Sequence, residues 1–100
     1  MKYDLLLNKD ILVDLGSKLK QHRLNQNITA KALAEKSGVS SRTITGFERG
    51  EKNISILNLI EILRALGLID NLSEIIPELP KISPLEMMEM EKKKRKRAGK

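Results

Sequence analysis

Residues 29–53 bring together side chains that donate hydrogen bonds or carry positive charge. The set combines hydroxyl groups, an amide and cations with one glycine, and comprises Thr29, Lys31, Ser40, Ser41, Arg42, Thr43, Thr45, Gly46, Arg49, Lys52 and Asn53. Arginine can donate two hydrogen bonds to guanine O6 and N7, and hydroxyl and ammonium groups bind phosphate oxygens. The segment therefore has the chemistry of a DNA-binding surface. Arg42 is the first candidate for a base contact, and a phosphate contact is the alternative for this arginine.

The chain does not contain the residue sets that most enzymes use. It has no cysteine and a single histidine, His22, which excludes a thiolate nucleophile, a cysteine-based zinc site and a histidine-pair metal site. Nor does the sequence offer a combination of nucleophile, base and orienting group, or a phosphate-binding loop. We therefore expect no catalytic activity, no cofactor and no metal. His22 lies in a polar stretch, where we expect it to be solvated or to face a phosphate.

Cap and turn residues divide residues 29–50 into two short helices. Thr29 and Ser40 are residue types that favour the N-cap position, and each precedes a helical stretch. Gly38 suits the left-handed position that ends the first helix. The spacing predicts the second helix over residues 41–49. Two short helices joined by a tight turn form the unit that places its second helix in the DNA major groove.

The predicted helix over residues 41–49 has an apolar face and a polar face. Ile44 and Phe47 recur at i,i+3, so we expect them to anchor the helix to the core. The outward face would then carry Arg42, Thr45 and Arg49, with Gly46 letting DNA approach the backbone closely. The alternative interpretation of this pattern is a helical hairpin within an ordinary bundle.

Helical periodicity extends over most of the remaining chain. We predict a first helix over residues 9–25, capped by Asn8 or Asp10, in which Gly16 permits a close helix contact. Its apolar positions are Ile11, Leu12, Leu15, Leu19 and Leu24. A helix capped by Ser55 is predicted over residues 56–66, with an apolar stripe formed by Leu57, Ile60, Leu63 and Leu66.

The predicted architecture is all-α: a compact five-helix domain with a flexible basic tail. The fifth helix should begin at Asp70 or Asn71 and run through Ile76. We divide the chain into a leader at residues 1–8, a DNA-binding domain at residues 9–76, and a proline-containing linker and basic tail at residues 77–100. For the leader, a short strand and an extra helical turn are both open.

The tail combines a helix-start signal with a dense run of cations. Ser83-Pro84-Leu85-Glu86 is a capping-box sequence, although an isolated helix of this length is marginal in water. The three methionines that follow could make loose hydrophobic contacts or bind a partner; they are Met87, Met88 and Met90. The basic run after them is expected to be either a solvated tail or a second contact with phosphates.

The net charge of +6 is unevenly distributed. Residues 15–66 contain nine lysines and arginines against four acidic residues, a local charge of +5. Residues 67–90 carry −4, and residues 91–100 carry +6. The predicted DNA-binding segment therefore lies in a basic region that an acidic segment separates from the basic tail.

Residues from about 15 to 68 resemble the Xre/Cro/CI helix-turn-helix family. The matching stretches are LGSKLKQHR, ITAKALAEKSGVSSRTITGFERG and ISILNLIEILRALGL. The resemblance implies a lambda-repressor-like domain whose second and third helices read double-stranded DNA. It also implies a structural ion pair between Arg23 and Glu48. Ala30 replaces the usual glutamine of the family, and Gly46 replaces a longer polar side chain, which puts the usual base contacts in doubt.

Three C-terminal stretches, RALGLIDNL, KISPLEMM and KKKRKRA, are similar to HipB-like antitoxins. This similarity implies a homodimer that represses its own toxin–antitoxin operon and binds a HipA-type Ser/Thr kinase toxin. A stand-alone phage-type repressor is the main alternative. A third possibility is an adaptor for RNA or the basal machinery, but the chain lacks the aromatic residues that stack on single-stranded bases.

A homodimer would place two recognition helices one turn of DNA apart, roughly 34 Å, on a palindromic operator. We expect aliphatic residues near the end of the domain to form the dimer contacts, namely Leu68, Ile69, Leu72, Ile75 and Ile76. The longest uncharged run, residues 53–60, is too short to span a bilayer, and the apolar stretch at residues 5–7 is too brief for a signal peptide. We therefore expect a cytoplasmic protein.

Overall fold

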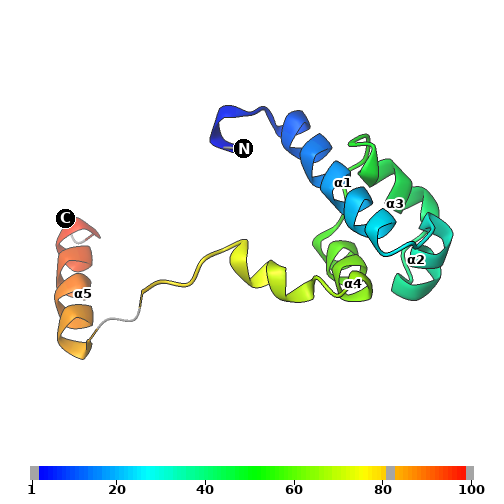
Figure 1. Ribbon diagram of the computed structural model, residues 1–100. Coiled ribbons are helices and arrows are strands. Elements are labelled where there is room, and N and C mark those ends of the chain that lie inside the picture. The colour runs from blue at the N-terminus through cyan, green and yellow to red at the C-terminus, as the bar shows by residue number, and fades with distance from the viewer. Residues whose placement is uncertain (1–2, 81–82, 99–100) are drawn as a thin grey trace.

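The computed structural model describes residues 3–80 and 83–98, with side chains described as far as residue 92. The regular structure in these ranges is entirely helical (Figure 1), as the sequence predicts. The elements are the 3-10 helix η1 (Tyr3–Leu5), the α-helices α1 (Asn8–Asn25), α2 (Ala30–Ser37), α3 (Ser41–Glu48) and α4 (Ile56–Leu66), the 3-10 helix η2 (Ile69–Glu74) and the α-helix α5 (Pro84–Ala98).

Helices α1 to α4 enclose one aliphatic core. Helix α3 packs against α1 and α2, α2 also packs against α4, and η2 packs against α4. Leu33, Ile44 and Ile62, from three different helices, are fully buried at its centre. Phe47 is the only aromatic residue in this core. The core holds α3 from one side, which leaves the other side of this helix at the surface.

Three predicted N-caps are confirmed. The side-chain oxygens of Thr29, Ser40 and Ser55 each accept a hydrogen bond from the backbone N–H three residues further on, at 3.0, 3.1 and 3.0 Å. These bonds satisfy N–H groups that the first turn of a helix otherwise leaves unpaired. The starts of α2, α3 and α4 are therefore fixed by local sequence.

The start of α1 differs from the prediction. Its N-cap residue is Leu7, which has no side-chain acceptor, so the expected cap by Asn8 or Asp10 is wrong. The Leu7 carbonyl accepts the N–H groups of Asp10 and Ile11 at 3.0 and 3.1 Å. The helix thus begins one residue before the range predicted from the sequence, with backbone groups alone completing its first turn.

The apolar face predicted for α1 is confirmed in part: Leu19 lies in the core and Leu12 packs against it. Gly16, Leu19 and Arg23 are buried, whereas Leu15 and Leu24 are 40% and 54% exposed. The buried positions recur at helical spacing, but two of them are a glycine and an arginine. A pattern built on leucine and isoleucine alone therefore includes exposed positions as well as core positions, and it omits the buried glycine and arginine.

The apolar stripe predicted for α4 is confirmed at Leu66, which lies in the core, and at Leu63, which packs against it, but is wrong at Leu57. Leu57 is 68% exposed, while Ile62, Ala65 and Leu66 are buried. Helix α4 carries aliphatic residues on most of its circumference, so periodicity alone does not show which side packs. Packing against α2 and η2 makes that choice.

Gly16 lies at a close contact between α1 and α3, as the sequence predicts. A Cβ atom at this position would lie 2.0 Å from the carbonyl oxygen of Phe47 and 3.0 Å from the carbonyl carbon of Glu48. No side chain fits there without moving the backbone of α3. The glycine therefore sets the distance between α1 and α3.

The leader forms a helical turn and is attached to α1 by polar contacts. The hydroxyl group of Tyr3 in η1 donates a hydrogen bond to Asp14, and Lys18 forms an ion pair with Asp14 at 3.0 Å. The Lys18 ammonium also lies 5.5 Å from the centre of the Tyr3 ring. Sequence analysis did not identify this cluster, since Tyr3 and Asp14 are brought together only by the turn between η1 and α1.

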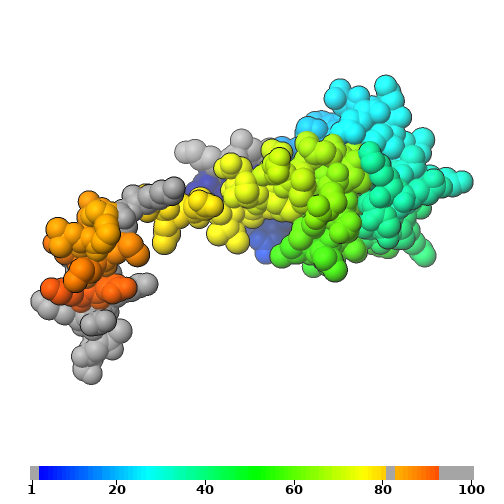
Figure 2. Space-filling view, turned by 90° about the horizontal axis from the view of Figure 1, so that it is seen from below, coloured from blue at the N-terminus to red at the C-terminus, as the bar shows by residue number. Residues whose placement is uncertain are grey.

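The C-terminal part of the fold differs from the five-helix prediction. Residues 69–74 form the 3-10 helix η2 rather than an α-helix, so the compact unit contains four α-helices and η2. The remaining α-helix, α5, stands apart from this unit (Figures 1 and 2). The hydroxyl of Ser83 accepts the N–H of Glu86 at 3.2 Å, as the capping-box sequence predicts. Within the described ranges, no helix combines the length and hydropathy of a membrane span.

Candidate nucleic-acid interface

Helix α3 is short and is fixed at both ends. At its start, Ser40 caps the helix and also donates a hydrogen bond to the hydroxyl of Thr43 at 2.8 Å. At its end, Gly50 has a φ of 72° and donates to the Phe47 carbonyl at 2.9 Å, while Glu51 donates to the Gly46 carbonyl at 3.0 Å. These two bonds form a Schellman motif, which requires a left-handed residue at the position of Gly50.

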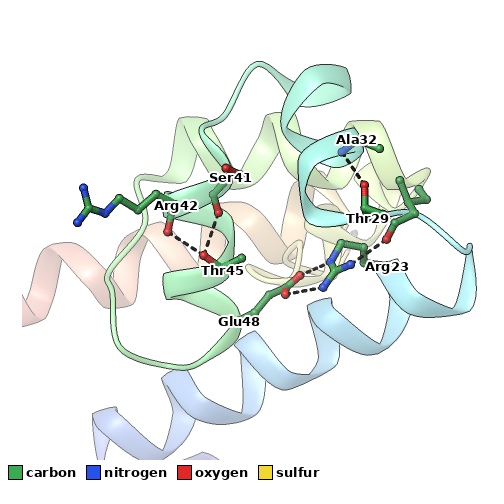
Figure 3. Close-up of polar contacts among 8 residues, drawn as sticks. Arg23, Thr29, Ala32, Ser41, Arg42, Thr45 and Glu48 are labelled. Carbon is green, nitrogen blue, oxygen red and sulfur yellow. Dashed lines mark hydrogen bonds and ion pairs between the residues drawn. The ribbon is translucent and has the colours of Figure 1, made fainter.

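The buried side of α3 carries the ion pair that the family resemblance implies. The Arg23 Nε donates to Glu48 Oε2 at 2.7 Å, and Arg23 Nη2 donates to Glu48 Oε1 at 3.0 Å (Figure 3). Arg23 Nη1 donates to the carbonyl of Ile28 at 2.8 Å. The hydrogen bond with Glu48 raises the pKa of Arg23, although burial acts against this. One arginine on α1 thus fixes both the end of α3 and the turn before α2.

The opposite side of α3 is exposed and polar. Ser41, Arg42 and Arg49 are exposed, and the Arg42 side chain extends away from the helix into solvent (Figure 3). The Thr45 hydroxyl donates to the carbonyl of Ser41 at 3.0 Å, and this residue is half-buried. This side has the guanidinium and hydroxyl groups that contact base edges and phosphates.

The other predicted DNA-binding residues are at the surface, with one partial exception. Thr29, Lys31, Ser40, Lys52 and Asn53 are exposed, and Thr43 is half-buried. Lys31 lies in the first turn of α2, where the unpaired N–H groups and the helix dipole also favour an anion. His22 is exposed on α1, as expected. The starts of α2 and α3 therefore both offer exposed polar groups.

Gly46 does not lie open at the surface, as the prediction of a close DNA approach assumed. This glycine is buried, because the side chain of Lys52 lies over it: a Cβ atom at position 46 would be 2.7 Å from Lys52 Cδ. The backbone at position 46 is therefore covered by a lysine stem and does not lie open for DNA to approach. Residue spacing within the helix gives no sign of this contact, since the covering side chain comes from the following loop.

Comparison with known families agrees with this arrangement. Residues 19–70 match the model of the helix-turn-helix family HTH_3, a stretch that includes α2, α3 and α4 in full. The chain belongs to this family. A comparison with curated proteins finds no match. HTH_3 members are generally DNA-binding regulators rather than enzymes, so the HTH_3 domain of this chain indicates a DNA-binding transcription regulator.

Proposed function

We propose that this HTH_3 protein is a sequence-specific repressor that binds double-stranded DNA with α3 in the major groove. The observation that carries the proposal is the two-sided environment of α3. Ile44, Phe47 and the Arg23–Glu48 pair hold one side, and Arg42 extends into solvent from the other. An α-helix fits the major groove of B-DNA, and a firmly held helix directs its side chains at fixed base positions.

We assign Arg42 to a base contact and Thr45 to a thymine methyl group, since both lie on the outward side of α3. The remaining polar residues are assigned to the DNA backbone, which receives half or more of protein–DNA hydrogen bonds. They are Thr29, Lys31, Ser40, Ser41, Thr43, Arg49, Lys52 and Asn53. The local charge of +5 over residues 15–66 supports this assignment, because it attracts DNA regardless of sequence.

Arg42→Ala tests the proposal once an operator has been selected from random DNA. Losing a bidentate arginine contact should reduce discrimination between operator and random DNA by about 1–3 kcal/mol. Fluorescence anisotropy with both DNAs measures the ratio. Arg64→Ala, which removes an exposed arginine from α4, is the matched control and should leave the ratio unchanged. An unchanged ratio in Arg42→Ala would remove α3 from base recognition.

We propose that the repressor acts as a homodimer on a palindromic operator. A single helix reads only a few base pairs, whereas two helices one DNA turn apart read two half-sites. Ile75 and Ile76 support the predicted contact region, because they are 62% and 81% exposed after η2. Leu68, Ile69 and Leu72 are half-buried and would border the contact. Sedimentation of the protein and of the Ile76→Asp variant tests this assignment: the variant should be monomeric.

Within this function we propose that the protein is the antitoxin of an operon that it represses, with a HipA-type Ser/Thr kinase toxin as partner. The support is the similarity of the C-terminal stretches to HipB-like antitoxins. In addition, Met87, Met88 and Met90 of α5 are 52–57% exposed, and methionine adapts well to partner surfaces. Co-purification with the product of a neighbouring kinase-like gene supports this role. DNA binding without such a partner would favour the stand-alone phage-type repressor.

A further inference from the structure

Gly46 lies on the outward side of α3 and is nevertheless buried. With 3.6 residues per turn, position 46 is within about 60° of both Arg42 and Arg49 around the helix. The side chain of Lys52 covers it. A Cβ atom at position 46 would lie 3.3, 2.9 and 2.7 Å from the Cβ, Cγ and Cδ atoms of Lys52. The lysine stem therefore rests on the one residue of this face that has no side chain.

The backbone fixes where the Lys52 side chain begins. The Gly46 carbonyl accepts hydrogen bonds from the N–H groups of both Glu51 and Lys52, at 3.0 and 3.2 Å. The first of these bonds belongs to the Schellman motif, and the second folds the next residue back onto α3 as well. Figure 3 shows the coil after α3 returning along the side from which Arg42 projects. Lys52, although outside the helix in sequence, is thus a part of its outward face.

We propose that Gly46 is a positioning residue for Lys52, and that the two residues act as one unit in binding a DNA phosphate. This inference rests on the proposed DNA-binding function and assigns a role within it. The glycine holds the lysine stem against α3, and the exposed ammonium group binds phosphate as a point charge. A stem that is already held against the protein loses less rotamer freedom when the phosphate binds. Any side chain at position 46 displaces the stem and weakens the contact.

Two substitutions separate the position of the stem from its charge. Gly46→Ala places a methyl group among the lysine carbons, which belong to a flexible side chain and can move away while α3 stays helical. Lys52→Met keeps most of the stem and removes the charge. Each phosphate contact contributes about 0.9 to the slope of log affinity against log salt concentration. We expect either substitution to lower this slope by about 0.9 per bound chain, and the double variant to lower it no further.

The preference for operator over random DNA should stay unchanged in these variants, because phosphate contacts carry no direct sequence information. Lys36→Met, which removes an exposed lysine from the last turn of α2, is the matched control. Any change that it causes in the salt slope should be the same with and without Gly46→Ala. Additive slopes for Gly46→Ala and Lys52→Met would overturn the coupling, and so would an unchanged slope in either single variant. If the wild-type chain itself shows no salt-dependent DNA binding, the proposed function fails. That outcome is distinct from a failure of the Gly46–Lys52 coupling alone.

Thermal unfolding tests the same contact without DNA. Lys52→Ala removes the two carbons that would lie closest to a Cβ atom at position 46, at 2.9 and 2.7 Å. The change in melting temperature caused by Gly46→Ala should therefore be more favourable in the Lys52→Ala background than in the wild-type chain. Equal changes in both backgrounds would show that the stem does not rest on Gly46 and would overturn the proposal.

Discussion

At the residue scale, the Arg23–Glu48 ion pair helps to hold α3 in one position. The two side chains are 9% and 3% exposed, and each Glu48 oxygen accepts one arginine N–H. Burying two charges is costly, so the pair contributes less to stability than its short distances suggest. Its main effect is to make one position of α3 strongly preferred, because any shift leaves both charges without a partner.

Replacing one member of this pair should lower the free energy of unfolding far more than replacing both. Glu48→Ala leaves the buried Arg23 charge uncompensated, and we expect the free energy of unfolding to fall by about 3 kcal/mol. The double variant Arg23→Met, Glu48→Met replaces the pair by apolar side chains and should lose less. Urea denaturation of the three proteins measures the difference. A double variant that is less stable than Glu48→Ala would contradict this account of the pair.

The ionisation of the Tyr3 hydroxyl reports whether the leader is attached to α1. Tyr3 is the only tyrosine and there is no tryptophan, so ultraviolet absorbance reports its ionisation alone. The hydrogen bond to Asp14 and partial burial raise the pKa of Tyr3 above its ordinary value of 10.0, although Lys18 acts in the opposite direction. Asp14→Asn should move the titration midpoint down toward 10.0, and Asp10→Asn should leave it unchanged. Equal midpoints in the wild type and Asp14→Asn would mean that the leader is not attached in this way.

The signs of these pKa shifts define the pH range in which the leader is held. Because the folded pKa of Tyr3 is raised, its contribution is complete below about pH 10 and is lost as the pH rises through the raised value. The hydrogen bonds of Tyr3 and then Lys18 lower the pKa of Asp14 below 3.8, so that contribution is present above the unfolded value and lost as the pH falls through the lowered one. The attachment of η1 is therefore expected at neutral pH and weakens at both extremes.

At the element scale, the starts of α2, α3 and α4 were predictable, whereas the start of α1 and the buried faces of α1 and α4 were less so. The caps at Thr29, Ser40 and Ser55 depend on a few neighbouring residues, which the sequence displays directly. The faces of α1 and α4 depend on which partner packs against them. The burial of Arg23 depends on Glu48, and the covering of Gly46 depends on Lys52. Contacts between distant positions decide these features, and single-sequence periodicity carries no information about them.

The crossing of α1 and α3 leads to a prediction about Gly16. In a helix interior, alanine is more favourable than glycine by about 1 kcal/mol, so Gly16→Ala would stabilise an isolated helix. Here the added methyl group would collide with the Phe47 carbonyl, 2.0 Å away, and push α3 from its place. We expect a net loss of about 1–3 kcal/mol in the free energy of unfolding. Ser17→Ala, at an exposed position of α1, serves as the control, and a gain of stability in Gly16→Ala would contradict the close contact.

At the scale of the whole molecule, the described structure is much more extended than a single compact domain. The radius of gyration is 19.1 Å, against roughly 13 Å for a compact chain of this length. The difference arises because α5 stands apart from the domain (Figure 2). Residues 75–83 separate η2 from α5 and could span at most roughly 30 Å when extended. If α3 binds DNA as proposed, the tail is therefore long enough to reach DNA beyond the part that α3 would contact.

The charge of the tail predicts that it takes part in DNA binding. Residues 91–100 carry +6, as much as the whole chain, while the acidic segment at residues 67–90 keeps them distinct from the basic domain. Deleting residues 92–100 should lower the slope of log affinity against log salt by about 0.9 for each phosphate that the shortened chain no longer binds, with no change in sequence preference. A full-length variant with glutamine in place of the lysines and arginines of this segment separates charge from length and should behave like the deletion. If the slope is the same in all three proteins, the tail is a solvated extension, and the domain alone accounts for binding to DNA.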